Sequence, residues 1–428
     1  MSSVVTGLEC SVCGARISIS TPLSWRCPNA STKDRHHVLR FVSDVRPFRP
    51  GADENPFLAY RHWLAVDAFG ESIGLTEDAR IRITTDLNTA IAGVGGVGFH
   101  RTPLQRADEL SDSLRFSANG GIWVKDETRN VAGSHKARHL MTEMIHLLMA
   151  EEAGVAPWSS PAQRPPLAIA SCGNAAIAAS TIAAAVSWPI AVHVPVAAAH
   201  EVVSTLQSLN ADIRVCPRVD TDPAGDPCVY RFREVVKSGA IPFGVQGTEN
   251  AWCLDGGRTI GWEIMEQMDN QVDRIFIQVG GGAFASCVAS SMKSVGVHPK
   301  LHAVQTEGCA PLSRAWDLAL ASGGARNAGP RWSSCMWPWE SEPHSLADGI
   351  LDDETYDWIG VLDGMADTGG SPVVAAEMSV VASHRMANEL TGIHVSPTGS
   401  AGLAGLLEIR ENIDDDERVV VVFSGIQR

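Results

Sequence analysis

Short apolar runs alternate with amphipathic or alanine-rich stretches along much of the chain, and turn-forming residues separate them. This pattern predicts strands at 166–171, 189–196 and 211–216, with helices between them at 175–186 and 198–210. A further apolar run at 273–279 leads through three glycines into a predicted helix at 283–296, and strands are predicted at 300–305 and 414–425. Repeated strand–turn–helix units favour an α/β fold whose mainly parallel sheets are flanked by helices.

The first 45 residues have a different character, because they carry closely spaced cysteines. Cys10 and Cys13 form a Cys-x-x-Cys pair, and Cys27 follows them. This spacing begins like a zinc ribbon, but Ala30 stands where the fourth cysteine is expected. Either the segment is a degenerate knuckle without metal, or His36 or His37 completes a Cys3His site for a structural zinc ion. A Pro- and Gly-rich linker, RPFRPGADENP, comes next.

Length, charge and cysteine content narrow the class of protein. A chain of 428 residues is expected to fold as two or three domains. The formal net charge of −15 argues against nucleic-acid binding, which needs a basic surface. No segment reaches the roughly 18 consecutive apolar residues of a membrane span, and the N-terminus lacks the features of a signal peptide. The ten cysteines are too sparse for a disulfide scaffold, so we expect a cytoplasmic protein.

Two predicted strand–turn–helix corners are candidate anion sites. The three glycines at 280–282 lie between a strand and a helix, where backbone N–H groups and the helix dipole favour an anion. They lack the Lys-Ser/Thr of a Walker loop, which points to a single phosphate without Mg²⁺; a plain tight turn is the alternative. ASCGNAA, at 170–176, forms the second corner, where free N–H groups suit a carboxylate. Asn174 offers a donor and an acceptor there, or is only a helix cap.

A lysine stands at the start of another predicted helix. Lys136 follows Ala-Gly-Ser-His within VKDETRNVAGSHKARHL, at 124–140. A lysine is nucleophilic only as the neutral amine, and the positive end of a helix dipole destabilises its ammonium form. A lone lysine is usually a solvated surface residue. Together with a phosphate cup and a carboxylate loop, however, it completes the parts that an enzyme using pyridoxal phosphate (PLP) needs.

Several ordered motifs resemble the fold type II PLP enzymes, the tryptophan synthase β-like family that includes threonine synthases, threonine and serine dehydratases and cysteine synthases. They are GFHRTPLQRADELSDSL with IWVKDETRNVAGSHKAR, then SCGNAA, QVGGGAFAS and SPTGSAGLAGL. The resemblance covers about Phe99 to the C-terminus. It implies a two-lobed fold with a large PLP-binding domain (46–136 and 263–428), a smaller inserted domain (137–262) and the cysteine knuckle (1–45). It also implies a homodimer acting on a small amino acid.

The same resemblance assigns roles to individual residues. Lys136 is expected to form the Schiff base with PLP, Asn174 to hydrogen-bond the 3′-oxygen of PLP, and Ser424 to face its pyridine nitrogen. The loop that takes the substrate carboxylate is expected to comprise Ser171, Cys172, Gly173 and Ala175. The phosphate is expected to lie on Gly280, Gly281, Gly282 and Ala283.

The chain also departs from the family pattern. His135 replaces the usual aromatic residue before the lysine, and is either a stacked core ring or a group that tunes the Schiff base or takes part in proton transfer. Cys172 stands where some members have a serine, and is either an acid–base group or a tolerated small residue. Glu307 lies in a segment that resembles a loop near the substrate.

These features favour β-elimination as the reaction. A neutral hydroxyl at Ser424 does not keep the pyridine nitrogen protonated, which suits loss of a β-substituent through an aminoacrylate better than transamination. The expected enzyme is a lyase that releases a keto acid and ammonia from a small hydroxy- or β-substituted amino acid. Threonine synthase, a β-replacement synthase and a non-catalytic binding relative are the alternatives. The first needs a pocket for a γ-phosphate, to which Arg138, Arg101 and Ser134 are candidate contributors.

Overall fold

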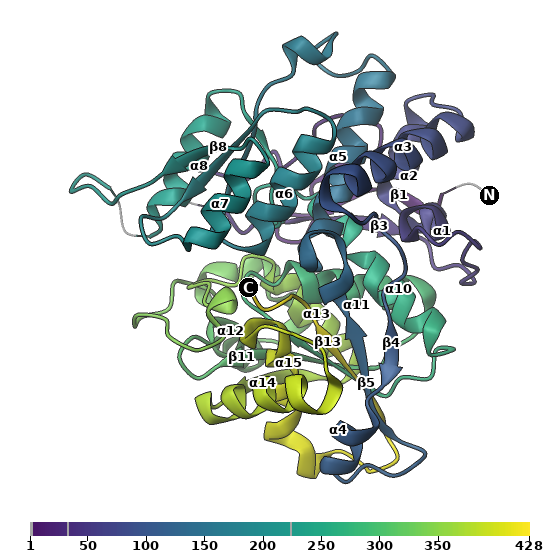
Figure 1. The fold of residues 1–428 in the computed structure, drawn as a ribbon, viewed down its shortest axis with the longest axis vertical. Coiled ribbons are helices and arrows are strands. Elements are labelled where there is room, and N and C mark those ends of the chain that lie inside the picture. The colour runs from purple at the N-terminus through teal and green to yellow at the C-terminus, as the bar shows by residue number, and fades with distance from the viewer. Residues whose placement is uncertain (1–2, 32–33, 223–224) are drawn as a thin grey trace.

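A computed structural model describes residues 3–31, 34–222 and 225–428, which form two lobes, one above the other in Figure 1. The lower lobe contains a six-stranded sheet in the order β12-β11-β10-β13-β5-β4. All neighbouring strands are parallel except the edge pair β4–β5. In sheet order the strands are Ser371–Ala375 (β12), Lys300–Thr306 (β11), Arg274–Gln278 (β10), Arg418–Phe423 (β13), Gly121–Asp126 (β5) and Leu104–Arg106 (β4).

The central strand β13 explains why this sheet needs helices on both sides. Val419, Val421 and Phe423 belong to a core cluster with α15, whereas Val420 and Val422 belong to another with α10, α11 and α13. Successive side chains of a strand point to opposite faces, so a continuous valine run requires two covered faces. The helices of this lobe are Asp108–Ser113 (α4), Cys253–Gly256 (α9), Arg258–Gln267 (α10), Ala283–Val295 (α11), Pro311–Ala321 (α12), Trp358–Thr368 (α13), Glu377–Thr391 (α14) and Pro397–Ile409 (α15).

The upper lobe is built on a smaller parallel sheet, in the order β8-β7-β6-β9. Its strands are Leu167–Ala170 (β6), Ile190–Val194 (β7), Asp212–Val215 (β8) and Ile241–Pro242 (β9), and its helices are Lys136–Glu152 (α5), Asn174–Ala185 (α6), His200–Ser208 (α7) and Pro227–Lys237 (α8). The strands and helices predicted from the alternating pattern in both lobes are thus confirmed, with ends that differ by a few residues.

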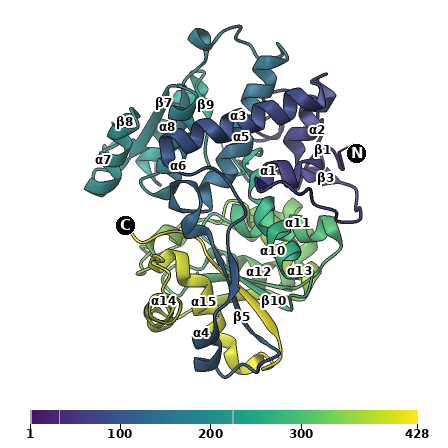
Figure 2. The same cartoon turned by 45° about the vertical axis from the view of Figure 1, so that its right-hand side comes forward.

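The N-terminal segment adds an antiparallel sheet and three helices. The strands are Val5–Cys10 (β1), Arg16–Ser18 (β2) and Leu39–Ser43 (β3), and the helices are Pro56–Ala59 (α1), Ala65–Ser72 (α2) and Glu77–Gly95 (α3). Helices α2 and α3 pack against α5, and α3 also packs against α6; Figure 2 shows α3 lying along the upper lobe. Within the described ranges, no helix combines the length and apolar character needed to cross a membrane.

A fully buried network of charges ties α5 to the lower lobe. Arg138 on α5 donates to Glu127 (2.8 Å) and to Glu263 on α10 (2.5 Å). Lys125 on β5 donates to the same Glu263 carboxylate at 2.6 Å. Although burial opposes ionisation, the two cations hold the pKa of Glu263 down at about 2. Each charge is therefore partnered, as buried charges must be.

Replacing Glu263 with Ala should destabilise the protein strongly, because it leaves Lys125 and Arg138 buried without their shared partner. We expect a loss of about 3–5 kcal/mol in the free energy of unfolding, measured by urea denaturation of the purified protein. Glu9→Ala is the matched control, since it removes an exposed ion pair with Arg16 and should cost no more than about 1 kcal/mol. Equal losses in the two variants would contradict this role of the network.

Candidate active site

The loop that carries Lys136 is held by the end of β13. The Ile426 N–H donates to the Gly133 carbonyl (2.9 Å), and the His135 N–H donates to the Ser424 carbonyl (3.0 Å). Gly133 has a φ of +68°, and a Cβ there would lie 2.7 Å from Cγ2 of Ile426. A glycine is therefore needed for this close approach. These bonds bring together residues almost 300 positions apart and fix the start of α5.

Lys136 is the first residue of α5, as predicted, and its side chain is half-buried. Burial lowers the pKa of its ammonium below the ordinary value, while the charges of Asp352 and Cys253 oppose that shift. Among the described residues, none forms a hydrogen bond or an ion pair with its Nζ atom. An amine of this kind is more often neutral than a solvated lysine, so it is a better nucleophile and base.

The glycine turn at 280–282 joins β10 to α11, and the segment 350–357 packs directly against it. A Cβ on Gly282, whose φ is +90°, would lie 2.8 Å from Cγ2 of Thr355, and one on Gly281 would lie 3.1 Å from the Tyr356 ring. The Asp357 N–H donates to the Gly281 carbonyl at 2.8 Å. Side chains at the turn would push the segment away, which is a physical reason for three successive glycines. Ala283, as predicted, begins α11.

Asp352 lies beside the glycine turn, close enough to Lys136 for their charges to interact, and sequence reasoning missed it. Its carboxylate occupies the space beside Gly280, and the Gly281 backbone favours its ionised form. Burial raises the pKa of Asp352 to about 6, although the nearby Lys136 opposes the rise. The backbone of the turn thus lies next to a carboxylate oxygen. The acidic pair that follows Ala-Asp-Gly-Ile in the sequence was the only available signal.

His135 connects the lysine loop to the start of α11. Its ring stacks on Phe284 with centroids 4.3 Å apart, and its Nδ1–H donates to the Ser424 carbonyl at 3.0 Å. Burial, followed by the charge of Lys136, holds the pKa of His135 well below the ordinary value. The ring is therefore neutral at physiological pH, and it is both stacked and next to the lysine.

Ser424 is buried at the end of β13 and has a partner that sequence reasoning did not identify. Gln278, two residues before the glycine turn, donates through Nε2 to Ser424 Oγ at 2.6 Å. The hydroxyl oxygen accepts this bond, so its own hydrogen is free to be donated elsewhere. The Oγ atom of the neighbouring Ser134 is also buried and has no hydrogen-bond partner among the described residues.

The loop before α6 meets the C-terminal residues of the chain. Asn174 is the first residue of α6, and its Oδ1 accepts a hydrogen bond of 2.9 Å from Nε of Arg428. A Cβ placed on Gly425 would lie 2.8 Å from Nδ2 of Asn174. A Cβ on Gly173 would meet no atom of the described residues within 4 Å. Arg428 gave no signal in the sequence.

The other residues expected in this loop differ in their exposure. Ser171 accepts a bond from the Gly173 N–H at 3.4 Å, and Ala175 is buried in the first turn of α6. Cys172 is exposed. Surrounding protein atoms, and then the charges of Asp226 and Asp348, raise the pKa of its thiol. It is therefore a thiol rather than a thiolate at neutral pH, and such a group donates a proton more readily than it accepts one.

Arg138 and Arg101 were candidate contributors to a γ-phosphate pocket, and the structure places both in ion pairs. Arg138 is completely buried in the charge network described above. Arg101 pairs with Glu266 at 3.0 Å. Both guanidinium groups are taken up by carboxylates, so they are not available to a substrate. Glu307 also has a local partner, since its carboxylate accepts a bond from the Glu377 N–H at the start of α14 (3.0 Å).

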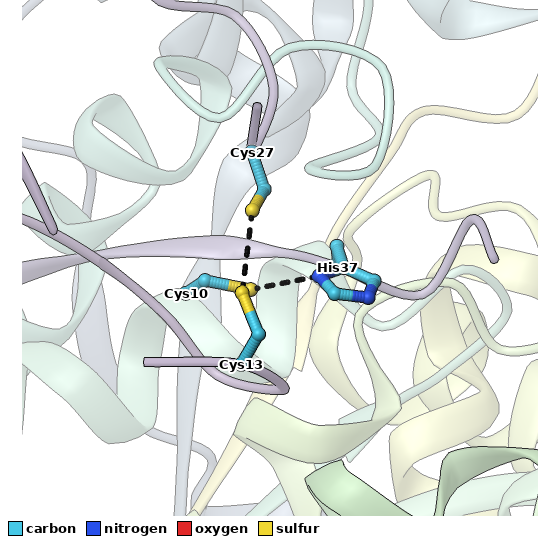
Figure 3. Close-up of side chains that lie close together, drawn as sticks. All are labelled: Cys10, Cys13, Cys27 and His37. Atoms are coloured by element: carbon cyan, nitrogen blue, oxygen red, sulfur yellow. Dashed lines mark hydrogen bonds between the residues drawn. The ribbon is translucent and has the colours of Figure 1, made fainter. Parts of the chain in front are cut away.

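The cysteines of the N-terminal segment form a separate cluster, shown in Figure 3. The sulfur atoms of Cys10, Cys13 and Cys27 and one ring nitrogen of His37 all lie within 4.8 Å of one another. Of the two histidines left open by the sequence, His37 is the one in the cluster. His36 lies instead against Glu354 (3.6 Å) and the Trp332 ring.

Comparison with known protein families identifies the chain's relatives. The family model described as "Pyridoxal-phosphate dependent enzyme" matches residues 97–425. A threonine synthase from Methanosarcina acetivorans is 25% identical over 333 residues, which cover 76% of this chain and 74% of that protein. A biosynthetic L-threonine dehydratase from Haemophilus influenzae is also 25% identical, over 76% of this chain and 56% of that protein.

Solved structures agree on the fold. The processed form of threonine deaminase isoform 2 from Solanum lycopersicum superimposes with a TM-score of 0.62 at 18% identity, covering 83% of this chain and 86% of that one. The family model spans most of the chain and contains the lysine loop, the glycine turn and the asparagine corner. The chain therefore belongs to the fold type II pyridoxal-phosphate-dependent enzymes, the family that its sequence motifs resemble.

Proposed function

We propose that the protein is a PLP-dependent lyase that eliminates a β-substituent from a small hydroxy- or β-substituted amino acid. For a β-hydroxy amino acid, water is lost across Cα–Cβ, and hydrolysis then gives a 2-oxo acid and ammonia. The observation that carries the proposal is the half-buried Lys136 amine, which has no bonded partner among the described residues and lies near the glycine turn and Ser424. A homodimer belongs to the same proposal.

The residues present fit PLP. The Gly281 backbone favours the ionised form of the neighbouring Asp352 carboxylate, as the backbone of a phosphate cup must favour an anion. Lys136 is available for a Schiff base, and the Ser424 hydroxyl has a hydrogen to donate to a pyridine nitrogen. Asn174 lies beside Gly425, next to Ser424, where it is suited to hydrogen-bond the 3′-oxygen. When bound, PLP supplies an electron-withdrawing ring that makes the substrate α-proton acidic.

The protein's own residues then remove the α-proton, bind the substrate carboxylate and set the electronic state of the pyridine ring. The depressed pKa of Lys136 allows its neutral amine to take the α-proton. The free N–H groups of the loop at 171–175 suit the substrate carboxylate. Ser424 is a hydroxyl rather than a carboxylate, so it does not stabilise a protonated pyridine. This weaker electron withdrawal favours prompt departure of a β-leaving group over transamination.

Elimination is favoured over threonine synthesis because the two candidate arginines already form ion pairs within the protein. O-Phosphohomoserine carries a γ-phosphate that needs a cationic pocket, and Arg138 and Arg101 are both held by carboxylates. The relatives do not decide the question, since a threonine synthase and a threonine dehydratase are both 25% identical to this chain. A β-replacement synthase is the second candidate, because it shares the first half of the reaction.

Replacing Lys136 should abolish the covalent attachment of PLP. We expect the wild-type protein to be yellow, to lose its visible band on borohydride treatment, and to carry the reduced cofactor on the peptide that contains Lys136. K136R should show no such adduct by mass spectrometry and should lose at least about 10³-fold in activity, because it removes the covalent and proton-transfer steps. K293R, at an exposed lysine on α11, is the matched control and should behave as wild type. An adduct on K136R would remove Lys136 from this role.

The products should distinguish elimination from its alternatives. We expect equal amounts of 2-oxo acid and ammonia from serine, threonine or β-substituted alanines, followed by a coupled dehydrogenase assay and ammonia detection. Inorganic phosphate from O-phosphohomoserine, with no turnover of the other substrates, would instead support threonine synthase. A new amino acid formed only when a thiol or amine is added would indicate β-replacement.

Asp352→Asn should strengthen PLP binding at alkaline pH. The pKa of Asp352 is raised to about 6, so in the wild type its negative charge develops beside the phosphate cup as pH rises through 6. The ratio of the wild-type Kd for PLP to the variant Kd should therefore be near one at pH 5 and several-fold at pH 8, where like charges repel in the wild type. Absorbance titration of the two apoproteins measures this ratio, and comparing them cancels the ionisation of PLP itself. A ratio that does not depend on pH would contradict the placement of Asp352 at the phosphate cup.

A further inference from the structure

Two donor–donor distances in the cysteine–histidine cluster match the edges of a tetrahedral metal centre. The Cys13 and Cys27 sulfurs are 3.6 Å apart, and the Cys10 sulfur is 3.4 Å from Nδ1 of His37. With Zn–S near 2.3 Å and Zn–N near 2.0 Å, a tetrahedron has S···S edges of about 3.8 Å and S···N edges of about 3.5 Å. In Figure 3 the four side chains converge on one point from separate segments of the N-terminal unit.

Groups around the cluster also match a metal site. Nε2 of His37, the nitrogen that points away from the sulfurs, donates to Asp34 at 2.9 Å. Metal-bound histidines characteristically donate their second N–H to a carboxylate in this way. The Val12 N–H donates to the Cys10 sulfur (3.4 Å), and the Asn29 amide donates to the Cys13 sulfur (3.3 Å). Such bonds stabilise thiolates, the form in which cysteine binds zinc.

The local backbone explains why a histidine takes the fourth position. The Ala30 N–H donates to the Cys27 carbonyl at 3.0 Å, which closes a tight turn after Cys27. Ala30 has no donor atom to offer there. His37, just before β3, reaches the cluster instead, and it does so because β3 pairs with β1, the strand that ends at Cys10.

The segment that leads to His37 also contacts the lower lobe. Arg35 forms an ion pair with Glu354, whose side chain is 3% exposed. His36 lies 3.6 Å from the same carboxylate, and its ring packs on Trp332 with centroids 4.6 Å apart. Glu354 belongs to the segment 350–357 that covers the glycine turn, where Thr355 and Asp357 contact Gly282 and Gly281. One short stretch of chain therefore links the cluster to the cover of the phosphate cup.

We infer that Cys10, Cys13, Cys27 and His37 bind one Zn²⁺ ion, and that this centre holds Arg35 and His36 against Glu354 so that the segment 350–357 stays packed on the glycine turn. The ion fixes the position of His37. Arg35 and His36 immediately precede His37 in the chain, so their positions are restricted as well. Arg35 and His36 are positioning residues, because they act through Glu354 and do not touch the glycines. The part of the inference that concerns the phosphate cup rests on the proposed PLP function.

Metal analysis tests whether the four residues bind zinc. The purified wild-type protein should contain about one equivalent of zinc by plasma mass spectrometry, and C27S should contain almost none. D34N keeps all four ligands and should still bind zinc, but with an affinity about 10–100-fold weaker in a chelator competition. C216S, at a buried cysteine of the upper lobe, is the matched control and should retain the metal. Full zinc content in C27S, or a metal-free wild type whose Cys13 and Cys27 form a disulfide, would overturn the site.

A variant that leaves the zinc ligands intact tests whether the centre keeps the segment 350–357 packed on the glycine turn. R35M should keep one equivalent of zinc, yet its amides at 350–357 should exchange with deuterium at least several-fold faster, since the segment has lost its anchor. Its Kd for PLP should rise several-fold. R16M, at an exposed residue on β2, should change neither quantity. Removing zinc from the folded wild-type protein with a chelator should reproduce the faster exchange without any substitution.

The possible failures are distinguishable. Unchanged exchange at 350–357 in R35M and in the zinc-depleted protein would overturn the positioning role while leaving the metal site intact. If the wild type bound no PLP, the proposed function would fail, but metal content and exchange would still report on the centre. If C27S failed to fold, the chelator experiment and D34N would decide the question.

Discussion

The site depends on keeping one lysine amine partly out of water while no carboxylate in the described part of the chain forms an ion pair with it. Burial lowers the pKa of Lys136, and such a group costs folding free energy that the surrounding structure must offset. The offset comes from rigid neighbours. Backbone hydrogen bonds from the end of β13 hold the loop before the lysine, and the ion network around Glu263 anchors the helix after it.

The glycine turn is a second feature on which several contacts of the site depend. Its three glycines allow the segment 350–357 to pack against it, and that segment brings Asp352 to the turn and Glu354 to the N-terminal unit. The segment 350–357 thus connects the glycine turn to the N-terminal unit that contains the cysteine cluster. His135 adds a direct link, because it stacks on Phe284 and bonds to the Ser424 carbonyl.

Local chemistry explains why so much of the fold was predictable. The strands and helices of both lobes follow from apolar runs and from glycine turns, which depend only on neighbouring residues. The lysine at a helix start and the glycines after a strand are equally local, and together with the family motifs they indicated a PLP enzyme. Gln278, Asp352 and Arg428 were missed because their importance lies in partners that are distant along the chain.

The sequence by itself determined the layered α/β architecture, the family, and the types of residue able to bind a phosphate, a carboxylate and an aldehyde. Only the tertiary structure decided which groups meet. It assigned Arg138 and Arg101 to ion pairs rather than to a phosphate pocket, and it chose His37 over His36 for the cysteine cluster. The reason is physical: periodicity and turn chemistry act over a few residues, whereas the partner of a charge or a thiol is set by how strands pair and helices pack.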